Sequence, residues 1–383
     1  MNADRWDIFC RVVDNYGDAS IAWRLARQLA LEHRLEVRLF IDVLHALARI
    51  ASDVDPARKI QRVRGVEVRA WEADRGGAAS DDPGVNIVEA FGCGLAPAYL
   101  DAMAARHPKP AWINLEYLSA ENWIEGCHGL ASPHPRLPLS RRFYFPGFTL
   151  ASGGLLRESG LLDRRDAFVA DTQQRMRLWE DLDLPLACAN ALTVSLFCYA
   201  DAPLASLLDT WADGDDPVLC IVPEGVAAGA LDRWTAGRMP HRGLPLTRGR
   251  LTLAVIPFMD QDEYDRLLWA CDANFVRGED SFVRAQWAGR PFVWQAYPQA
   301  ENAHRLKVDA FLALYTEAMD HDAGDAVKNL SNAWNQDGDA GATWKAFAAQ
   351  RRSLQSYTRS WADRLASQRD LASGMVRMAA NKV

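Results

Sequence analysis

The sequence predicts an α/β protein in which two doubly wound, Rossmann-like lobes face one another across a cleft. A chain of 383 residues exceeds the size at which one hydrophobic core usually stops growing, so we expect two domains. Short apolar runs alternate with helical patterns in both halves, a succession typical of a parallel sheet with helices on both faces. A segment rich in Gly, Pro and Ser, residues 146–160, separates the two series. Ligands of such sheets bind at the carboxyl ends of the strands.

The first lobe opens with an apolar run at 6–13 and an amphipathic run at 19–32, which predict a strand and then a helix. Further strands are expected at 35–42, 85–91 and 109–117. In the second lobe the pattern predicts strands at 191–199, 217–222, 251–258, 272–277 and 291–295, and helices at 203–212, 260–270 and 281–288. The stretch at about 323–380 has a helical composition. We therefore place the first lobe at 1–155, joined by a C-terminal helix at about 358–383, and the second lobe at 156–357.

The composition indicates a cytoplasmic protein. Hydrophobic residues make up 49% and charged residues 24% of the chain, as in ordinary soluble globular proteins. The seven cysteines form no CxxC pair, which favours reduced thiols. The opening MNADRWDIFCRV fits neither a signal nor a transit peptide, and no apolar segment approaches the roughly 18 residues that span a bilayer. A net charge of −7 argues against nucleic acid or an anionic membrane as a partner.

Two carboxylates flank the turn between the first strand and the first helix, DNYGD at 14–18. On one interpretation Asp18 is simply the N-cap of the helix, and Asn15 and Gly17 only shape the turn. On the other, Asp14 and Asp18 supply a general base and an anchor for a cationic or hydroxyl-bearing group. The turn by itself leaves both interpretations open.

A second charged turn ends a strand of the second lobe. Arg277 closes the strand, Gly278 turns the chain, and Glu279, Asp280 and Ser281 lead into a helix. A helix N-terminus with the Ser281 hydroxyl and the Arg277 guanidinium suits an anion such as a pyrophosphate. Glu279 and Asp280 would instead accept hydrogen bonds from sugar hydroxyls or bind a cationic acceptor. The alternative is a plain capped helix whose acids favour the helix dipole.

Aromatic residues end two other strands of the second lobe. Phe197 and Tyr199 follow one strand, Phe258 follows another, and Gln261 stands at the next helix start. Such rings beside a phosphate site could stack a nucleobase. The alternative is that they belong to the hydrophobic core.

Several signals are missing from the sequence. There is no GxxxxGK[ST] phosphate loop, and FGCGLAP at 91–97 lacks the third glycine of a dinucleotide fingerprint. The acids of DGDD at 213–216 are expected in a solvated loop. Cys127, His128 and His134 match no standard zinc spacing. We therefore expect no metal.

These segments together resemble the EarP family of bacterial protein-arginine rhamnosyltransferases, which modify translation elongation factor P. The resemblance covers essentially the whole chain. Its marks are DIFCRVVDNYGDASIAWRLARQLA (7–30), INLEYLSAENWIEGCHGL (113–130), LTVSLFCY (192–199), IPFMDQDEYDRLLWACDANFVRGEDSFVRAQWAGRPFVWQ (256–295) and QAENAH (299–304). Ala19-Ser20 stands where Ile-Gly is common in the family, and this departure leaves the spacing of the acids intact.

The resemblance implies a glycosyltransferase of GT-B architecture that is inverting, uses no metal or cofactor, and moves rhamnose from dTDP-β-L-rhamnose to an arginine of elongation factor P. It implies that Asp18 is the general base and that Asp14 and Glu279 are the other required acids, with Asn15 and Gly17 beside the substrate. The residues that resemble the thymine and deoxyribose pocket are Phe197, Tyr199, Phe258 and Gln261, and those that resemble the ribose and diphosphate contacts are Arg277, Asp280 and Ser281. The donor would occupy the second lobe and the acceptor would approach the first.

Two other functions stay open on the residues alone. One is an NAD-type Rossmann oxidoreductase or a nucleotide-sugar epimerase, which the missing third glycine disfavours. The other is a non-catalytic protein whose two α/β lobes bind a partner.

Overall fold

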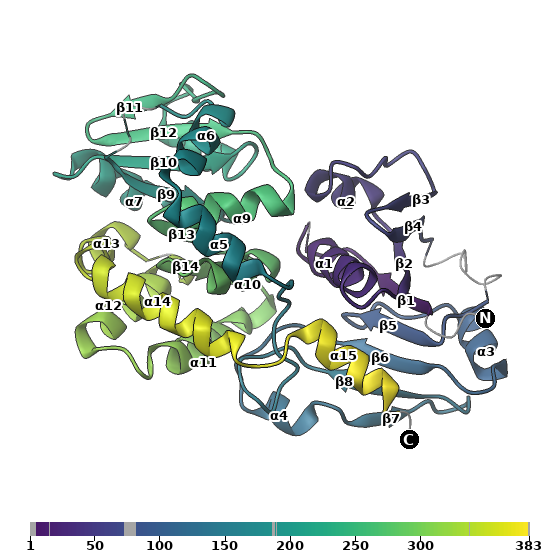
Figure 1. Ribbon diagram of the computed structural model, residues 1–383. Helices are drawn as coiled ribbons and strands as arrows, with labels where there is room; N and C mark the ends of the chain where they lie inside the picture. The colour runs from purple at the N-terminus through teal and green to yellow at the C-terminus, as the bar shows by residue number, and fades with distance from the viewer. Residues whose placement is uncertain are drawn as a thin grey trace. The chain divides into compact units, whose positions relative to one another are not determined.

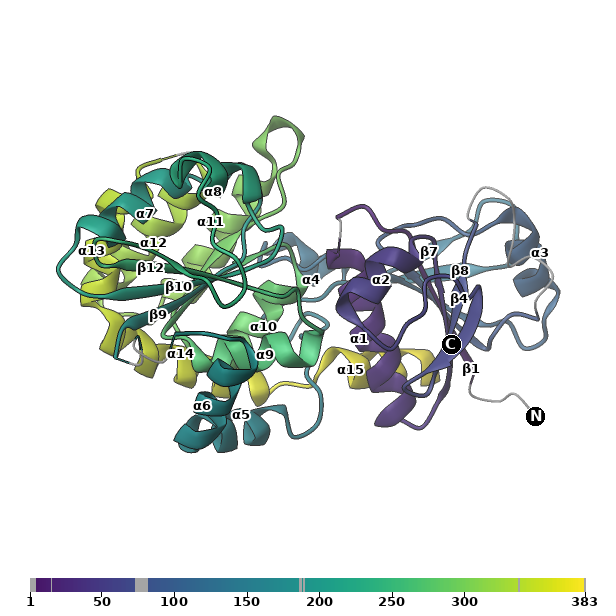
Figure 2. The same ribbon diagram turned by 90° about the horizontal axis from the view of Figure 1, so that it is seen from above.

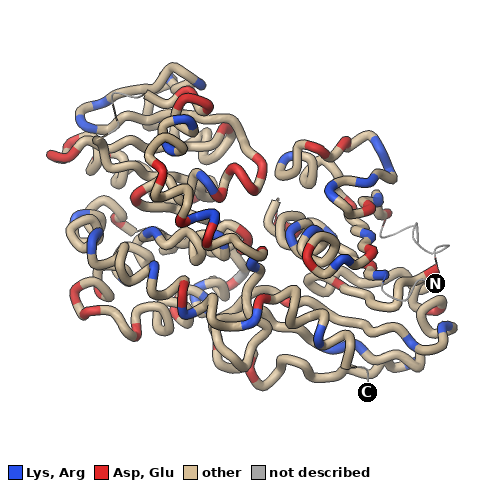
Figure 3. Tube along the Cα trace, viewed as in Figure 1, with Lys and Arg blue, Asp and Glu red and all other residues tan. Residues whose placement is uncertain are grey.

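The computed structural model describes residues 5–14, 16–72, 82–185, 188, 190–336 and 338–381. The chain divides into two compact units (Figure 1). Unit 1 comprises Met1–Ser159 and Leu365–Val383, and unit 2 comprises Gly160–Arg364. Charged residues of both signs are interspersed along the trace of each unit (Figure 3). Within the described ranges, no helix has the length and apolar character needed to cross a membrane.

Unit 1 is built on a sheet whose described strands run in the order β3-β4-β2-β1-β5-β6-β8-β7. The strands are β1 (Arg5–Cys10), β2 (Glu36–Ile41), β3 (Ile60–Val63), β4 (Val66–Ala70), β5 (Asn86–Ala90), β6 (Ala111–Leu115), β7 (Ala131–Pro133) and β8 (Ser140–Tyr144). Its helices are α1 (Gly17–Leu31), α2 (Leu44–Ile50), α3 (Pro97–Ala105), α4 (Trp123–Cys127) and α15 (Leu371–Ala380). The six strands from β4 to β8 in this order pair in parallel, and β3 and β7 add antiparallel edges.

Both faces of this sheet are covered. Helices α1 and α15 contact each other, α1 packs on β1 and β2, and α15 packs on β6. On the other face Phe9 stacks on Phe40, with ring centroids 4.5 Å apart, and the same cluster includes Tyr99 and Met103 of α3. Every residue of β1 is buried, as expected for a parallel strand between two helical layers.

Unit 2 holds a second sheet, with described strands in the order β11-β12-β10-β9-β13-β14. The strands are β9 (Leu192–Leu196), β10 (Val218–Pro223), β11 (Leu246–Arg248), β12 (Leu251–Ile256), β13 (Ala273–Arg277) and β14 (Phe292–Gln295). The helices are α5 (Leu161–Ala170), α6 (Thr172–Asp181), α7 (Leu204–Asp213), α8 (Ala228–Trp234), α9 (Gln261–Ala270), α10 (Asp280–Ala288), the 3-10 turn η3 (Ala300–Asn302), α11 (His304–Thr316), α12 (His321–Asn335), α13 (Ala340–Ala349) and α14 (Arg351–Ala366). Figure 2 shows α7 and α8 on one side of these strands, and α5, α9 and α10 on the other.

The predicted α/β fold with two Rossmann-like, mostly parallel sheets is confirmed. The prediction missed the antiparallel edge strands β3, β7 and β11, which are only three or four residues long, and the parallel strands β4 and β8. Short edge strands that are largely exposed carry little of the hydrophobic signal on which the sequence pattern depends.

The borders of the units differ from the predicted limits at 155/156 and about 358. Residues 156–159 stay with unit 1 because Arg24 pairs with Glu158 at 3.1 Å and Ser159 N–H donates to Glu32 at 2.7 Å. Helix α14 stays with unit 2 until its last turn, where the Trp361 indole N–H donates to Gln286 at 2.7 Å. The return to unit 1 therefore falls at Arg364/Leu365.

Candidate active site

The Asp18 carboxylate holds the turn that follows β1. The strand ends at Cys10, not near residue 13, and the chain then leaves the sheet. Oδ2 of Asp18 accepts hydrogen bonds from the N–H groups of Val13 at 2.7 Å and Asp14 at 2.9 Å. The N–H of Val12 donates to Oδ1 of Asp42 at 2.9 Å. These amides are satisfied by carboxylates, so they need no neighbouring strand.

Asp18 is not the N-cap of α1, so that part of the structural interpretation is wrong. Tyr16 occupies the cap position and makes no side-chain cap hydrogen bond. Asp18 lies inside the first turn, is only 2% exposed, and reaches back to the loop. Its other oxygen, Oδ1, accepts no hydrogen bond from the part of the chain that the structure describes. The positive end of the helix dipole favours a carboxylate at this place.

Asp14 lies against the first turn of the same helix. Gly17 N–H donates to the Asp14 carbonyl at 2.6 Å, and a Cβ added at Gly17 would lie 2.6 Å from Oδ2 of Asp14. The carboxylate therefore covers the Cα of Gly17, and a larger residue would displace it. Asp14 is half-buried and hence more accessible than Asp18. Asn15, also predicted here, lies outside the described residues.

A cysteine at the end of β1 is kept neutral. Burial raises the pKa of the Cys10 thiol, and the nearby Asp18, Cys93 and Asp42 add to the shift. A thiol whose pKa is raised in this way stays protonated at neutral pH. Cys10 therefore gives the loop neither a nucleophile nor a base.

In unit 2, Arg277 lies against two aromatic rings at the carboxyl end of the sheet. Its Cζ is 4.4 Å from the ring centroid of Phe197 and 4.7 Å from that of Tyr199. Its Nη1 donates to the carbonyl of Cys198 at 2.9 Å. Phe258 meets Phe197 edge to face, with centroids 6.3 Å apart. Two of the three rings predicted to stack a base, Phe197 and Tyr199, are therefore in contact with the guanidinium predicted to bind phosphate.

The turn into α10 presents a helix N-terminus without a side-chain cap. Glu279 occupies the cap position and its side chain makes no cap hydrogen bond, so the plain-cap interpretation is wrong. Asp280 is buried and accepts a hydrogen bond from Gln261 at 3.2 Å. The Ser281 hydroxyl accepts from Arg277 N–H at 3.0 Å and donates to the Arg277 carbonyl. Ser281 thus closes the turn, and the positive end of the α10 dipole suits an anion.

One residue of this site was missed by the sequence interpretation. The ring of Tyr264 on α9 lies 5.6 Å from that of Phe197, and its buried hydroxyl has no hydrogen-bond partner among the described residues. Burial raises the pKa of this phenol. The signal was available, because Tyr264 stands three positions after Gln261 and therefore shares its helix face.

The structure therefore gathers the predicted residues into two sets. In unit 1, Gly17 and Asp18 lie in the first turn of α1, and Asp14 lies in the loop that packs against this turn. The residues gathered at the carboxyl end of the unit 2 sheet are Phe197, Tyr199, Phe258, Gln261, Arg277, Glu279, Asp280 and Ser281. That the two sets act on one pair of substrates stays a prediction.

The described residues contain no group of three or more His, Cys, Asp or Glu side chains placed to hold a metal. His128 Nδ1 accepts from Phe145 N–H at 3.1 Å and His134 Nδ1 from Leu137 N–H at 3.0 Å. Both Nδ1 atoms are therefore occupied by backbone hydrogen bonds and are not placed to bind a metal.

Comparisons with known proteins place the chain in a family. The family model of the elongation factor P rhamnosyltransferase EarP matches residues 6–380. A protein-arginine rhamnosyltransferase of Pseudomonas putida is 47% identical over 378 residues, which cover 99% of each chain. One of Pseudomonas aeruginosa is 43% identical over 376 residues, covering 98% of this chain and 99% of that one.

Solved structures agree with this assignment. A structure described as the basis for EarP-mediated arginine glycosylation of translation elongation factor EF-P has 36% identity and a TM-score of 0.71, with 99% of this chain and 100% of that chain covered. A glycosyltransferase of Rickettsia africae shares only the fold, with 8% identity, a TM-score of 0.52, and coverage of 98% and 97%. The chain belongs to the EarP family of elongation factor P rhamnosyltransferases.

Proposed function

We propose that this protein transfers rhamnose from dTDP-β-L-rhamnose to an arginine side chain of elongation factor P, with inversion and without a metal. Membership of the EarP family supports this over the dehydrogenase, epimerase and non-catalytic alternatives. The observation that carries the proposal is the pair of carboxylates at the start of α1, Asp18 in its first turn and Asp14 in the loop that packs against that turn.

An arginine acceptor requires such acids. The guanidinium is always charged and delocalised, so its nitrogen is a very poor nucleophile. Carboxylates can bind this cation, orient it, and accept a proton as the bond to the sugar forms. Asp14 is the more accessible acid and would pair with the cation. Asp18 keeps one oxygen for the proton while the other holds the loop.

The donor is proposed to lie in unit 2. Bond formation between the arginine nitrogen and C1 of rhamnose breaks the bond from C1 to the diphosphate, which leaves with the electron pair. Arg277 and the uncapped N-terminus of α10 would stabilise the charge that develops there. Because these groups supply positive charge, the transfer needs no metal.

The nucleoside would contact the aromatic set. Phe197 and Phe258 are half-buried, so part of each ring is accessible to a thymine. Asp280 and Gln261, already hydrogen-bonded to each other, would bind the sugar hydroxyls and the base. We also propose that the protein works in the cytoplasm, beside the translation factor that it modifies.

Intact-mass analysis of elongation factor P tests the proposal. After incubation with this protein and dTDP-rhamnose, the factor should gain the mass of one deoxyhexose, and fragmentation should place it on an arginine. A factor in which that arginine is lysine is the matched control. If the factor gains no mass while NAD binds to the protein, the proposal is wrong.

A further inference from the structure

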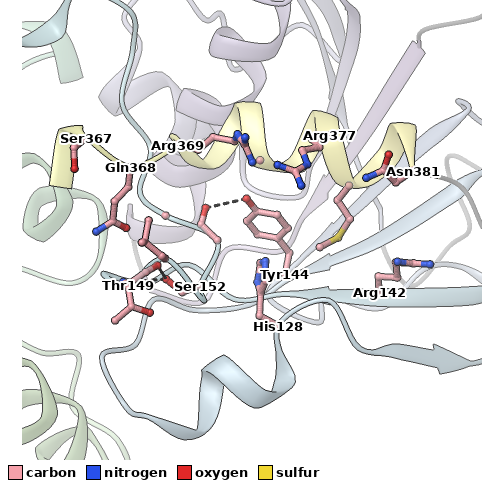
Figure 4. Close-up of a pocket in the computed structure, with 15 residues that line it drawn as sticks. His128, Arg142, Tyr144, Thr149, Ser152, Ser367, Gln368, Arg369, Arg377 and Asn381 are labelled. Atoms are coloured by element: carbon pink, nitrogen blue, oxygen red, sulfur yellow. Dashed lines mark hydrogen bonds between the residues drawn. The ribbon is translucent and has the colours of Figure 1, made fainter. Parts of the chain in front are cut away.

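Unit 1 contains a pocket formed by His128 just after α4, by β8 and the segment that follows it, and by α15 with the segment that leads into it (Figure 4). Its volume is about 490 Å³, within the range of small-molecule sites. Residues 149–150, 152–154 and 367–369 are among those that line it. These segments lie close in sequence to the two crossings of the chain, at Ser159/Gly160 and Arg364/Leu365.

The floor of the pocket is rigid. The buried hydroxyl of Tyr144 donates to the carbonyls of Gly153 at 2.8 Å and Leu371 at 3.1 Å. A Cβ at Gly153 or at Gly374 would lie 2.2 Å from an atom of the Tyr144 ring or its hydroxyl. Strand β8, the segment that follows it and the start of α15 are therefore packed as closely as their backbones allow. The floor of the pocket is formed before any ligand binds.

Three arginines surround this floor. Arg142 stands on β8, and Arg369 and Arg377 stand before and on α15. None of the described residues that line the pocket is acidic, and these three side chains make no ion pair within the described ranges. Figure 4 shows the Arg377 side chain extending from α15 toward Tyr144. In a protein of net charge −7, an acid-free pocket with three arginines is a local concentration of positive charge.

A histidine adds a neutral donor. His128 Nδ1 accepts from Phe145 N–H at 3.1 Å, so the neutral ring carries its proton on Nε2. Burial lowers the pKa of His128, which keeps the ring neutral at pH 7. Glu125, which accepts from the Thr149 hydroxyl at 2.7 Å, and Asp370, which accepts from Ser373 N–H at 3.0 Å, stand beside the pocket without lining it.

We propose that this pocket binds a small phosphate monoester. Planar guanidinium groups match the oxygens of a phosphate, and the three arginines with the His128 N–H provide more donors than a carboxylate can use. Met378 and the ring of Tyr144 offer apolar surface to the organic part of the ligand. An acidic peptide is disfavoured because the preformed floor and a volume of about 490 Å³ suit a small molecule better than an extended chain.

Calorimetry on the full chain at low ionic strength tests the proposal, with inorganic phosphate, glucose 6-phosphate and a polyglutamate peptide as probes. We expect glucose 6-phosphate to bind, and Arg142→Gln or Arg377→Gln to weaken its binding about tenfold. Arg136→Gln removes an exposed charge of the same unit outside the pocket and should change nothing. Thermal unfolding of each variant should match the parent, since Arg377 is exposed and Arg142 half-buried.

The other outcomes separate this pocket from the donor site. Binding that is lost in Arg277→Gln but kept in Arg142→Gln and Arg377→Gln would assign the phosphate to unit 2 and overturn the proposal. Binding of polyglutamate without either phosphate probe would also overturn it, because the surface would then suit an acidic protein segment. Tighter binding of glucose 6-phosphate than of inorganic phosphate supports a monoester; equal or weaker binding contradicts it.

Discussion

Replacing Asp18 separates its chemical role from its structural one. Its Oδ2 accepts two backbone N–H groups, at 2.7 and 2.9 Å. Asp18→Asn keeps an oxygen in that place and removes the charge, whereas Asp18→Ala removes both. Hydrogen bonds to charged groups contribute about 1.5–3 kcal/mol each, and water replaces part of this in an exposed loop. We therefore expect Asp18→Ala to lower the free energy of unfolding by about 2–4 kcal/mol, or roughly 5–15 °C in melting temperature. Asp18→Asn should cost about 1 kcal/mol.

The loss of catalytic rate in these variants should not follow their loss of stability. Without its base, Asp18→Asn should lose about 10²–10⁴ in single-turnover rate while binding dTDP as the parent does. The rate is measured by the intact mass of elongation factor P at saturating donor, and dTDP affinity by calorimetry. Asp42→Asn is the matched control, because Asp42 holds the N–H of Val12 in the same loop at 2.9 Å. A parental rate in Asp18→Asn, or an equal loss in Asp42→Asn, would refute the assignment of Asp18 as the base.

Four further predictions follow from the same geometry. Arg277→Ala should weaken dTDP binding about tenfold to a hundredfold in calorimetry. Arg248→Ala removes a comparable contact, with Trp234 at 4.7 Å, and should leave dTDP binding unchanged. If Arg277→Ala binds dTDP as tightly as the parent does, the diphosphate lies elsewhere. Gly17→Ala should displace the Asp14 carboxylate, whose Oδ2 lies 2.6 Å from the position of the new Cβ. Turnover should fall at least about tenfold while dTDP binding stays intact. In the control Gly126→Ala the new Cβ meets nothing within 4 Å, and turnover should stay at the parental rate. Full activity after EDTA treatment is expected, and activity that only added magnesium restores would contradict a metal-independent transfer. Burial raises the pKa of Cys198 to about 12, so this thiol should not be alkylated in the folded protein at pH 8, as measured by peptide mass. Rapid alkylation of Cys198 would show that the chain after β9 opens to solvent.

Most of the parallel core could be predicted, because strands such as β10 and β12 are short apolar runs between helical patterns. The parallel strands β4 and β8 each carry two charged residues, and they were missed. The ends of strands were harder to place. Val13 is apolar and extends the first run, yet it is 63% exposed, because the Asp18 carboxylate takes its N–H away from the sheet. Such a side chain to backbone contact spans five positions and leaves no mark on hydrophobic periodicity.

The site could be predicted by position but not by contact. That Arg277 ends a strand is visible in the sequence, and the carboxyl ends of parallel strands meet at one edge. That its guanidinium lies against Phe197 and Tyr199 depends on β9 and β13 being neighbours. Strand order is a property of the whole sheet, so no local pattern specifies it.

The two charges central to the proposal are held by neutral partners. Asp18 is fixed by backbone amides, and Arg277 by two rings and a carbonyl; neither forms an ion pair with a described residue. Other buried charges are instead held in ion pairs. Arg38 pairs with Asp7 at 2.6 Å and Arg284 pairs with Asp265 at 2.6 Å, and within each pair the two charges cancel. A neutral partner orients a charge without cancelling it. Asp18 would therefore keep its full charge for a cationic acceptor and Arg277 for an anionic leaving group, and this difference separates them from the ionic pairs that only support the fold.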